Sequence, residues 1–170
     1  TDLPCIALQF GEASAVVSLY GAQVLSYQPQ PGKDVLWLSP LAQWHDQMPI
    51  RGGVPVCWPW FGPAAKPFNA ADVKLPNHGL VRNRLWRQVH AEQSAQHCLV
   101  SLSIDVDDIP TVSRSVTLQL TLTLTADTLT LQLDCAEPML QQAALHSYFA
   151  VPSLYDTSVS PLPTAYLDKT

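Results

Sequence analysis

Hydrophobic and polar residues alternate with a period of two along much of this chain. In residues 115–125, Val116 and four leucines alternate with threonine and glutamine without an error, and residues 128–134 repeat the pattern after the short break Ala126-Asp127. Alternation of this kind predicts strands with one buried face. Two such strands joined by a short polar break predict an antiparallel hairpin.

Further strands are predicted wherever the same alternation returns in shorter form. The clearest covers residues 100–106, and the other candidates are residues 6–10, 15–20, 23–27, 35–38, 85–91, 143–151 and 165–167. No window has a helical stripe, and 15 prolines exclude long helices. One-sided alternation favours antiparallel sheets packed face to face. We therefore expect residues 1–170 to form a single all-β domain, an antiparallel β-sandwich.

Residues 49–76 do not follow the strand pattern. They contain six prolines, three glycines and two tryptophans. Long irregular segments within a compact domain are usually functional or disordered. Because this one is too aromatic for disorder, we expect a packed loop at a site.

The charges are distributed unevenly. The formal net charge is −5, which argues against a general nucleic-acid or acidic-membrane binder. Six of the nine cations nevertheless lie between Arg51 and Arg87, where Asp72 is the only acid. This cationic stretch indicates a small anionic ligand bound at one place. The alternative is that the cations pair with acids of other strands, as we expect for at least half of them.

The chain lacks the sequence signals of membrane insertion and export. Its apolar runs are too short to span a membrane, and residues 1–4 do not resemble a signal peptide. The four cysteines lie far apart and have no zinc-binding spacing. We therefore expect reduced thiols and a cytoplasmic protein.

The first of three candidate motifs is residues 50–62, IRGGVPVCWPWFG. Paired glycines after Arg51 would let the backbone approach a ligand, and the guanidinium suits phosphate or carboxylate. Trp58, Trp60 and Phe61 could form an apolar platform for a sugar ring. A glycine turn followed by an aromatic core is an equally good interpretation. Cys57 is better explained as a small buried hydrophobe than as a nucleophile.

The other two motifs each contain a histidine. In residues 76–86, His78 and Arg82 stand four positions apart across a glycine, so Arg82 could join Arg51 in binding an anion. In residues 143–151, His146 and Tyr148 share one face of a predicted strand and offer a proton donor and a polar contact. The alternatives are a solvated or capping His78 and a half-buried structural His146. No nucleophile elbow, phosphate-binding loop or dinucleotide motif occurs.

Together, several segments resemble the hexose-6-phosphate mutarotases, the glucose-6-phosphate 1-epimerases of the aldose 1-epimerase superfamily. They are GAQV at 21–24, DVLWLS at 34–39, residues 50–62, HGLVRN at 78–83, LHSYF at 145–149 and YLDK at 166–169. The resemblance implies a galactose-mutarotase-like β-supersandwich and interconversion of the anomers of a phosphorylated aldohexose. It also implies that the protein uses no metal or organic cofactor.

The resemblance further implies a role for each matching residue. His146 corresponds to the general acid, His78 contacts the sugar, and Arg51 and Arg82 bind the phosphate. The family's general base is a glutamate near the C-terminal end, which we expect beyond Thr170, so this chain would be the N-terminal part of a longer fold. If the chain ended at Thr170, we would expect it to associate with itself. Two alternatives to an enzyme remain, a non-catalytic sugar-phosphate-binding module and a structural sandwich.

Overall fold

The computed structural model describes residues 3–45 and 48–165, and all the regular elements there are strands. They are β1 (Cys5–Phe10), β2 (Ala13–Ser18), β3 (Val24–Gln28), β4 (Val56–Cys57), β5 (Arg87–Gln93), β6 (Cys98–Val106), β7 (Val116–Leu124), β8 (Leu129–Cys135) and β9 (Ala144–Leu145). All neighbouring strands pair antiparallel, which confirms the predicted fold class. Within these residues, no helix is long and apolar enough to cross a membrane.

The larger sheet has the order β5-β6-β7-β8, and β7 lies inside it. The apolar side chains of β7 all have 0% exposure, whereas the polar ones between them are partly or fully exposed. The hairpin of β7 and β8 pairs Leu118 with Cys135 through to Leu124 with Leu129. The predicted period of two therefore fixes both the strand positions and the buried face.

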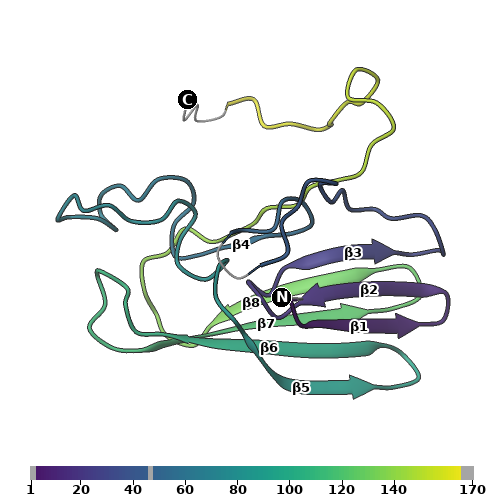
Figure 1. Cartoon of the computed structure of the whole chain (residues 1–170), viewed down its shortest axis with the longest axis horizontal. Helices are drawn as coiled ribbons and strands as arrows, with labels where there is room; N and C mark the ends of the chain where they lie inside the picture. The colour runs from purple at the N-terminus through teal and green to yellow at the C-terminus, as the bar shows by residue number, and fades with distance from the viewer. Residues whose placement is uncertain (1–2, 46–47, 166–170) are drawn as a thin grey trace.

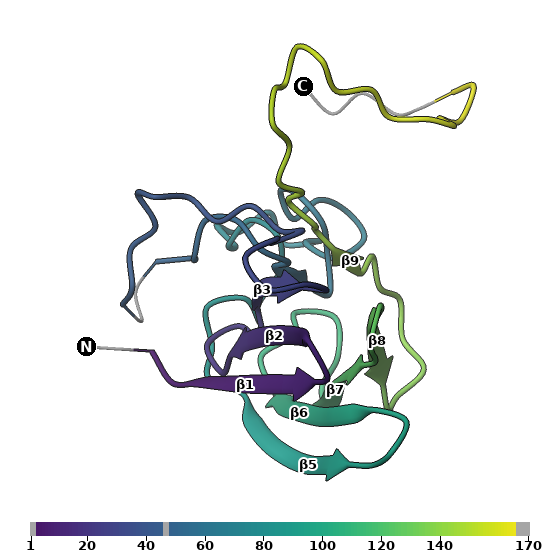
Figure 2. The ribbon, with the colours of Figure 1, turned by 90° about the vertical axis from the view of Figure 1, so that its right-hand side faces the viewer.

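The smaller sheet has the order β1-β2-β3 and packs on the larger one. Its buried residues Leu8, Ala15 and Val17 belong to the same core cluster as the leucines of β7. The two sheets overlap in the view of Figure 1, and Figure 2 shows the β1–β3 layer facing β6 and β7. This is the expected β-sandwich.

Strand β9 is shorter than predicted from residues 143–151. Its chain nevertheless stays extended, because the backbone N–H of His146 donates to the Pro55 carbonyl (3.0 Å) and that of Tyr148 donates to Gly53 (2.9 Å). The Ala150 N–H then donates to Val35 (2.9 Å). The segment thus changes partners along its length, which divides one long predicted strand into pieces. Beyond residue 150 the chain leaves the sandwich, and the predicted strand at 165–167 lies mostly outside the described residues (Figures 1 and 2).

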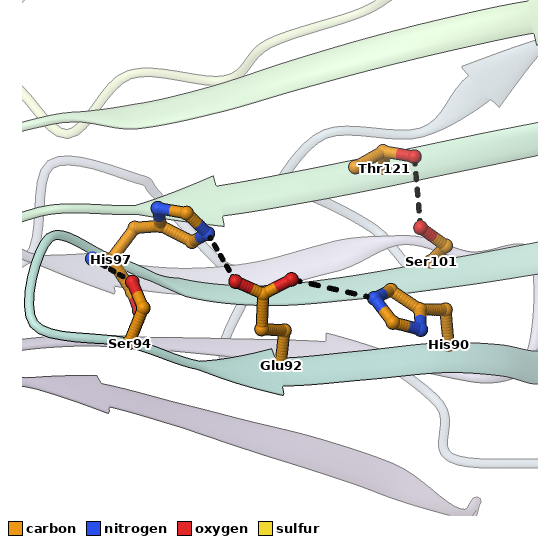
Figure 3. Close-up of polar contacts among 6 residues, drawn as sticks. All are labelled: His90, Glu92, Ser94, His97, Ser101 and Thr121. Atoms are coloured by element: carbon orange, nitrogen blue, oxygen red, sulfur yellow. Dashed lines mark hydrogen bonds and ion pairs between the residues drawn. The ribbon is translucent and has the colours of Figure 1, made fainter.

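A polar cluster lies at the far end of the hairpin of β5 and β6. Figure 3 shows the Glu92 carboxylate between two imidazoles, with Nε2 of His97 at 3.4 Å and Nε2 of His90 at 3.7 Å. Ser94 accepts the backbone N–H of His97 across the turn (3.1 Å). These side chains therefore support the hairpin.

Candidate functional site

Arg51 lies on a segment that runs beside the start of β3 and beside the chain around Trp37. Close packing of backbone on backbone explains the two glycines that follow it. A Cβ atom at Gly53 would stand 2.1 Å from the Val24 carbonyl oxygen, and one at Gly52 would stand 2.4 Å from the Trp37 oxygen. The two glycines thus allow this segment to lie close to the backbones at Val24 and Trp37. The Arg51 side chain is exposed to solvent.

His78 lies where a loop returns to the chain after β4. The Leu80 N–H donates to the Trp58 carbonyl (2.8 Å), and the Gly62 N–H donates to Nδ1 of His78 (3.1 Å). Because Nδ1 accepts a hydrogen bond, the neutral ring carries its proton on Nε2. Burial, followed by the charges of Arg82 and His146, lowers the pKa of His78, which favours this neutral form.

His146 comes from the extended chain after β9 and faces His78. Their ring centroids are 6.4 Å apart, and Phe61 contacts both rings, at 4.9 Å from His78 and 5.6 Å from His146. Tyr148 lies on the same side, with its ring 4.9 Å from that of His146, as the predicted shared face requires. Nδ1 of His146 is buried without a hydrogen-bond partner among the described residues.

Arg82 lies near His78 and Arg51. Burial lowers its pKa most, and the Arg51 charge lowers it further. The guanidinium stays protonated at neutral pH in any case. The two arginines therefore lie close enough to repel each other, an arrangement that an anion between them would relieve.

Of the six cations in the cationic stretch, two are paired with acids in the described part of the chain. Arg84 forms a two-point ion pair with Asp108, and Arg87 pairs with Asp105 (2.8 Å). The expectation that at least half would be paired is not met there. Among the residues that the structure describes, neither Arg51 nor Arg82 has a carboxylate partner.

Two aromatic residues of the motif at 50–62 lie in the core instead of on the site. Trp60 is 1% exposed, packs against Phe68 and donates its indole N–H to the Pro76 carbonyl (3.0 Å). The expectation that Trp60 contacts substrate is therefore wrong, because no face of its ring is open. Trp58 is equally buried, and its indole N–H donates to Gln141. Phe61 is the aromatic side chain of this motif that reaches the site.

Cys57 is buried beneath the site, as predicted for a small hydrophobe. Burial raises the pKa of its thiol, an effect that the charge of Arg82 only partly offsets. At neutral pH the thiol is therefore protonated, which argues against a nucleophile. All four cysteines are free.

No carboxylate of the described residues stands beside the two histidines. Glu92 pairs with His97, Glu137 pairs with Arg114 (3.1 Å), and Glu12 lies exposed in the turn between β1 and β2. The described ranges also contain no group of three or more His, Cys, Asp or Glu side chains that could hold a metal ion. The site thus offers imidazole, guanidinium and phenol groups.

Five residues were predicted from the sequence to form the site, and the structure places all five in one region. They are Arg51, His78, Arg82, His146 and Tyr148. Of the three aromatic residues proposed as a sugar platform, Phe61 is the one that contacts the two histidines. The residues YLDK at 166–169, which also carry the resemblance, lie outside the described residues.

Comparison with known proteins gives a consistent result. The family model for aldose 1-epimerase matches residues 4–167. The chain is 33% identical to the "Putative glucose-6-phosphate 1-epimerase" of Salmonella typhimurium and likewise 33% identical to that of Escherichia coli. In each case the match covers 99% of this chain and 55% of the relative, so the chain spans about half the length of these curated relatives.

Solved structures agree with the sequence matches. A crystal structure of a putative mutarotase from Salmonella typhimurium superposes with a TM-score of 0.76 at 31% identity. The match covers 88% of this chain and 49% of that one. Given the family match over residues 4–167 and the mutarotase-like sandwich, this chain belongs to the aldose 1-epimerase family.

Proposed function

We propose that this chain supplies the phosphate-binding and general-acid side of a hexose-6-phosphate 1-epimerase. The substrate would be a phosphorylated aldohexose, whose α and β anomers interconvert through the open-chain aldehyde. The observation that carries the proposal is the convergence of two arginines without a carboxylate partner on two neighbouring histidines. The names of the relatives support the same substrate class.

The arrangement suits acid–base ring opening. Ring opening needs a proton delivered to the ring oxygen and another removed from the anomeric hydroxyl, and each positioned group contributes about 10²–10⁴-fold. His146 is held by a backbone hydrogen bond to Pro55 and by the rings of Phe61 and Tyr148, which suits a proton donor of fixed position. His78 presents Nε2–H as a neutral donor and would orient a sugar hydroxyl. The base would come from outside the described residues.

Arg51→Ala is expected to weaken glucose 6-phosphate binding by about 1.5–3 kcal/mol, the loss typical of a charge-assisted hydrogen bond. Glucose binding should barely change, because the guanidinium would contact only the phosphate. Isothermal titration calorimetry with both ligands makes the comparison. Lys66→Ala removes an equal charge from an exposed position in the same cationic stretch and serves as the control. Equal losses for glucose and glucose 6-phosphate would show that Arg51 supports the fold instead.

The lowered pKa of His78 predicts a pH dependence of stability. Between the lowered folded pKa and the unfolded value of about 6.5, the unfolded chain binds more protons than the folded one. Stability should therefore rise with pH through this window and be lost as the pH falls below about 6.5. Urea unfolding at a series of pH values should show a shallower acid loss in His78→Asn than in wild type. The same acid loss in both proteins would contradict the assignment.

A second function, sugar-phosphate binding without catalysis, is favoured by the lack of a carboxylate beside His78 and His146 in the described residues. Polarimetry of freshly dissolved α-glucose 6-phosphate separates the two functions in a protein that joins this chain to the remaining half of the family's length. Faster approach to anomeric equilibrium supports the epimerase, whereas binding with the uncatalysed rate supports the binding module.

A further inference from the structure

Gln23 is a polar side chain buried between the sandwich and the segment of Arg51. It stands between β2 and β3 and is 1% exposed. Its Nε2 donates to the carbonyl oxygens of Ile50 (3.1 Å) and Gly52 (2.6 Å). One amide nitrogen thus holds the residue before and the residue after Arg51.

This contact determines how the backbone at Arg51 is oriented. The carbonyl oxygens of residues 50 and 52 both accept from Gln23, so they face it together. The carbonyl between them, that of Arg51, accepts the Ser39 N–H on the other side (3.0 Å). This segment meets β3 in a single bridge at Val54, whose N–H donates to the Val24 carbonyl (2.8 Å). Gln23 therefore takes the place that a neighbouring strand would occupy.

We infer that Gln23 is a positioning residue that aims Arg51 at the phosphate of the substrate. This inference rests on the proposed function, because it assigns the anion to Arg51. Gln23 holds the Ile50 carbonyl and the Ser39 N–H holds the Arg51 carbonyl, so both peptide groups that flank Arg51 are fixed and its Cα–Cβ bond has a set direction. Because the base of the side chain is fixed, the exposed guanidinium loses less conformational entropy when it binds an anion. Gln23 itself lies in the core and touches no ligand.

Glutamine suits this position because a primary amide nitrogen carries two N–H donors. Leucine fills a similar volume without any donor, so both carbonyls would lose their partner. Asparagine keeps the amide but withdraws it by one methylene group, which prevents it from holding both oxygens. These two variants therefore remove the positioning contact to different degrees.

The test is a double-mutant cycle of Gln23→Leu and Arg51→Ala, with calorimetric titration of glucose 6-phosphate and of glucose. Gln23→Leu should raise the Kd for glucose 6-phosphate roughly 10-fold, within the range of coupling in one hydrogen-bond network, and leave the Kd for glucose unchanged. In the Arg51→Ala background the same substitution should cause no further loss of affinity for glucose 6-phosphate, because no guanidinium remains to be positioned. Gln23→Asn should show the same ligand selectivity and serves if the leucine variant does not fold.

The outcomes separate the positioning role from the phosphate site itself. If Arg51→Ala keeps wild-type affinity for glucose 6-phosphate, the phosphate site is misassigned and the proposed function fails there. If Arg51→Ala loses affinity but both Gln23 variants keep it, only the positioning role is overturned. Equal losses for glucose and glucose 6-phosphate in the Gln23 variants, or additive losses in the cycle, would assign Gln23 a purely structural role.

Discussion

Replacing His146 by asparagine is expected to slow the interconversion of glucose 6-phosphate anomers by about 10²–10⁴-fold, the contribution of one positioned acid–base group. Asparagine keeps polarity and similar size but cannot deliver a proton. Affinity should change much less than turnover, because the proposed phosphate contacts are made by arginines and not by His146. The experiment requires a protein in which this chain is joined to the remaining half of the family's length and which shows epimerase activity.

Ser147→Ala is the matched control for this variant. Ser147 neighbours His146 on the same extended segment but is exposed, and successive side chains of an extended chain point to opposite faces. Its replacement should leave turnover near wild type. Magnetisation-transfer NMR measures the exchange rate between anomers, and calorimetry measures affinity in the same samples. Unchanged turnover in His146→Asn would end the assignment of the general acid.

The sandwich could be predicted because its strands show a regular alternation of apolar and polar residues in the sequence. In β7 every second residue is buried, so the alternation of Val116 and the following leucines with polar residues identifies both the strand and its face. The turn at Ala126-Asp127 fixes the hairpin with β8. Local pattern and tertiary structure agree here because burial in a one-sided sheet repeats every two residues.

The interior of the irregular segment could not be predicted in the same way. Trp60 and Phe61 are adjacent in sequence, yet Trp60 is buried against Phe68 and Phe61 contacts the two histidines. Which aromatic ring faces the site depends on contacts with Pro76 and with His78, made by a later part of the chain. No periodicity encodes those contacts.

The role suggested for Gln23 was equally hidden. A glutamine at the start of a predicted strand is ordinary, and its importance depends on carbonyls 27 and 29 positions away in sequence. The resemblance drew attention to the residues around Gln23 without explaining them. The hydrogen bonds supply the physical reason.

Gly79→Ala is expected to destabilise the fold by more than about 4 kcal/mol, among the largest effects of a single substitution. Gly79 has a φ of +82°, and a Cβ atom there would stand 1.9 Å from the Trp58 carbonyl oxygen and 2.3 Å from its carbon. The left-handed backbone alone costs roughly 1–2 kcal/mol for alanine. The remainder is the clash with a backbone that is fixed by the hydrogen bond from Leu80 to Trp58.

Gly32→Ala separates these two contributions. Gly32 has a similar φ of +75°, but a Cβ atom there would meet nothing within 4 Å. This control should therefore lose only the conformational cost, roughly 1–2 kcal/mol, in urea unfolding. If Gly79→Ala still folds, the chain must have moved apart at Trp58, which carries His78 away from Phe61 and weakens sugar binding. Equal destabilisation in the two variants, with sugar binding intact, would show that the close approach at Trp58 does not hold the site together.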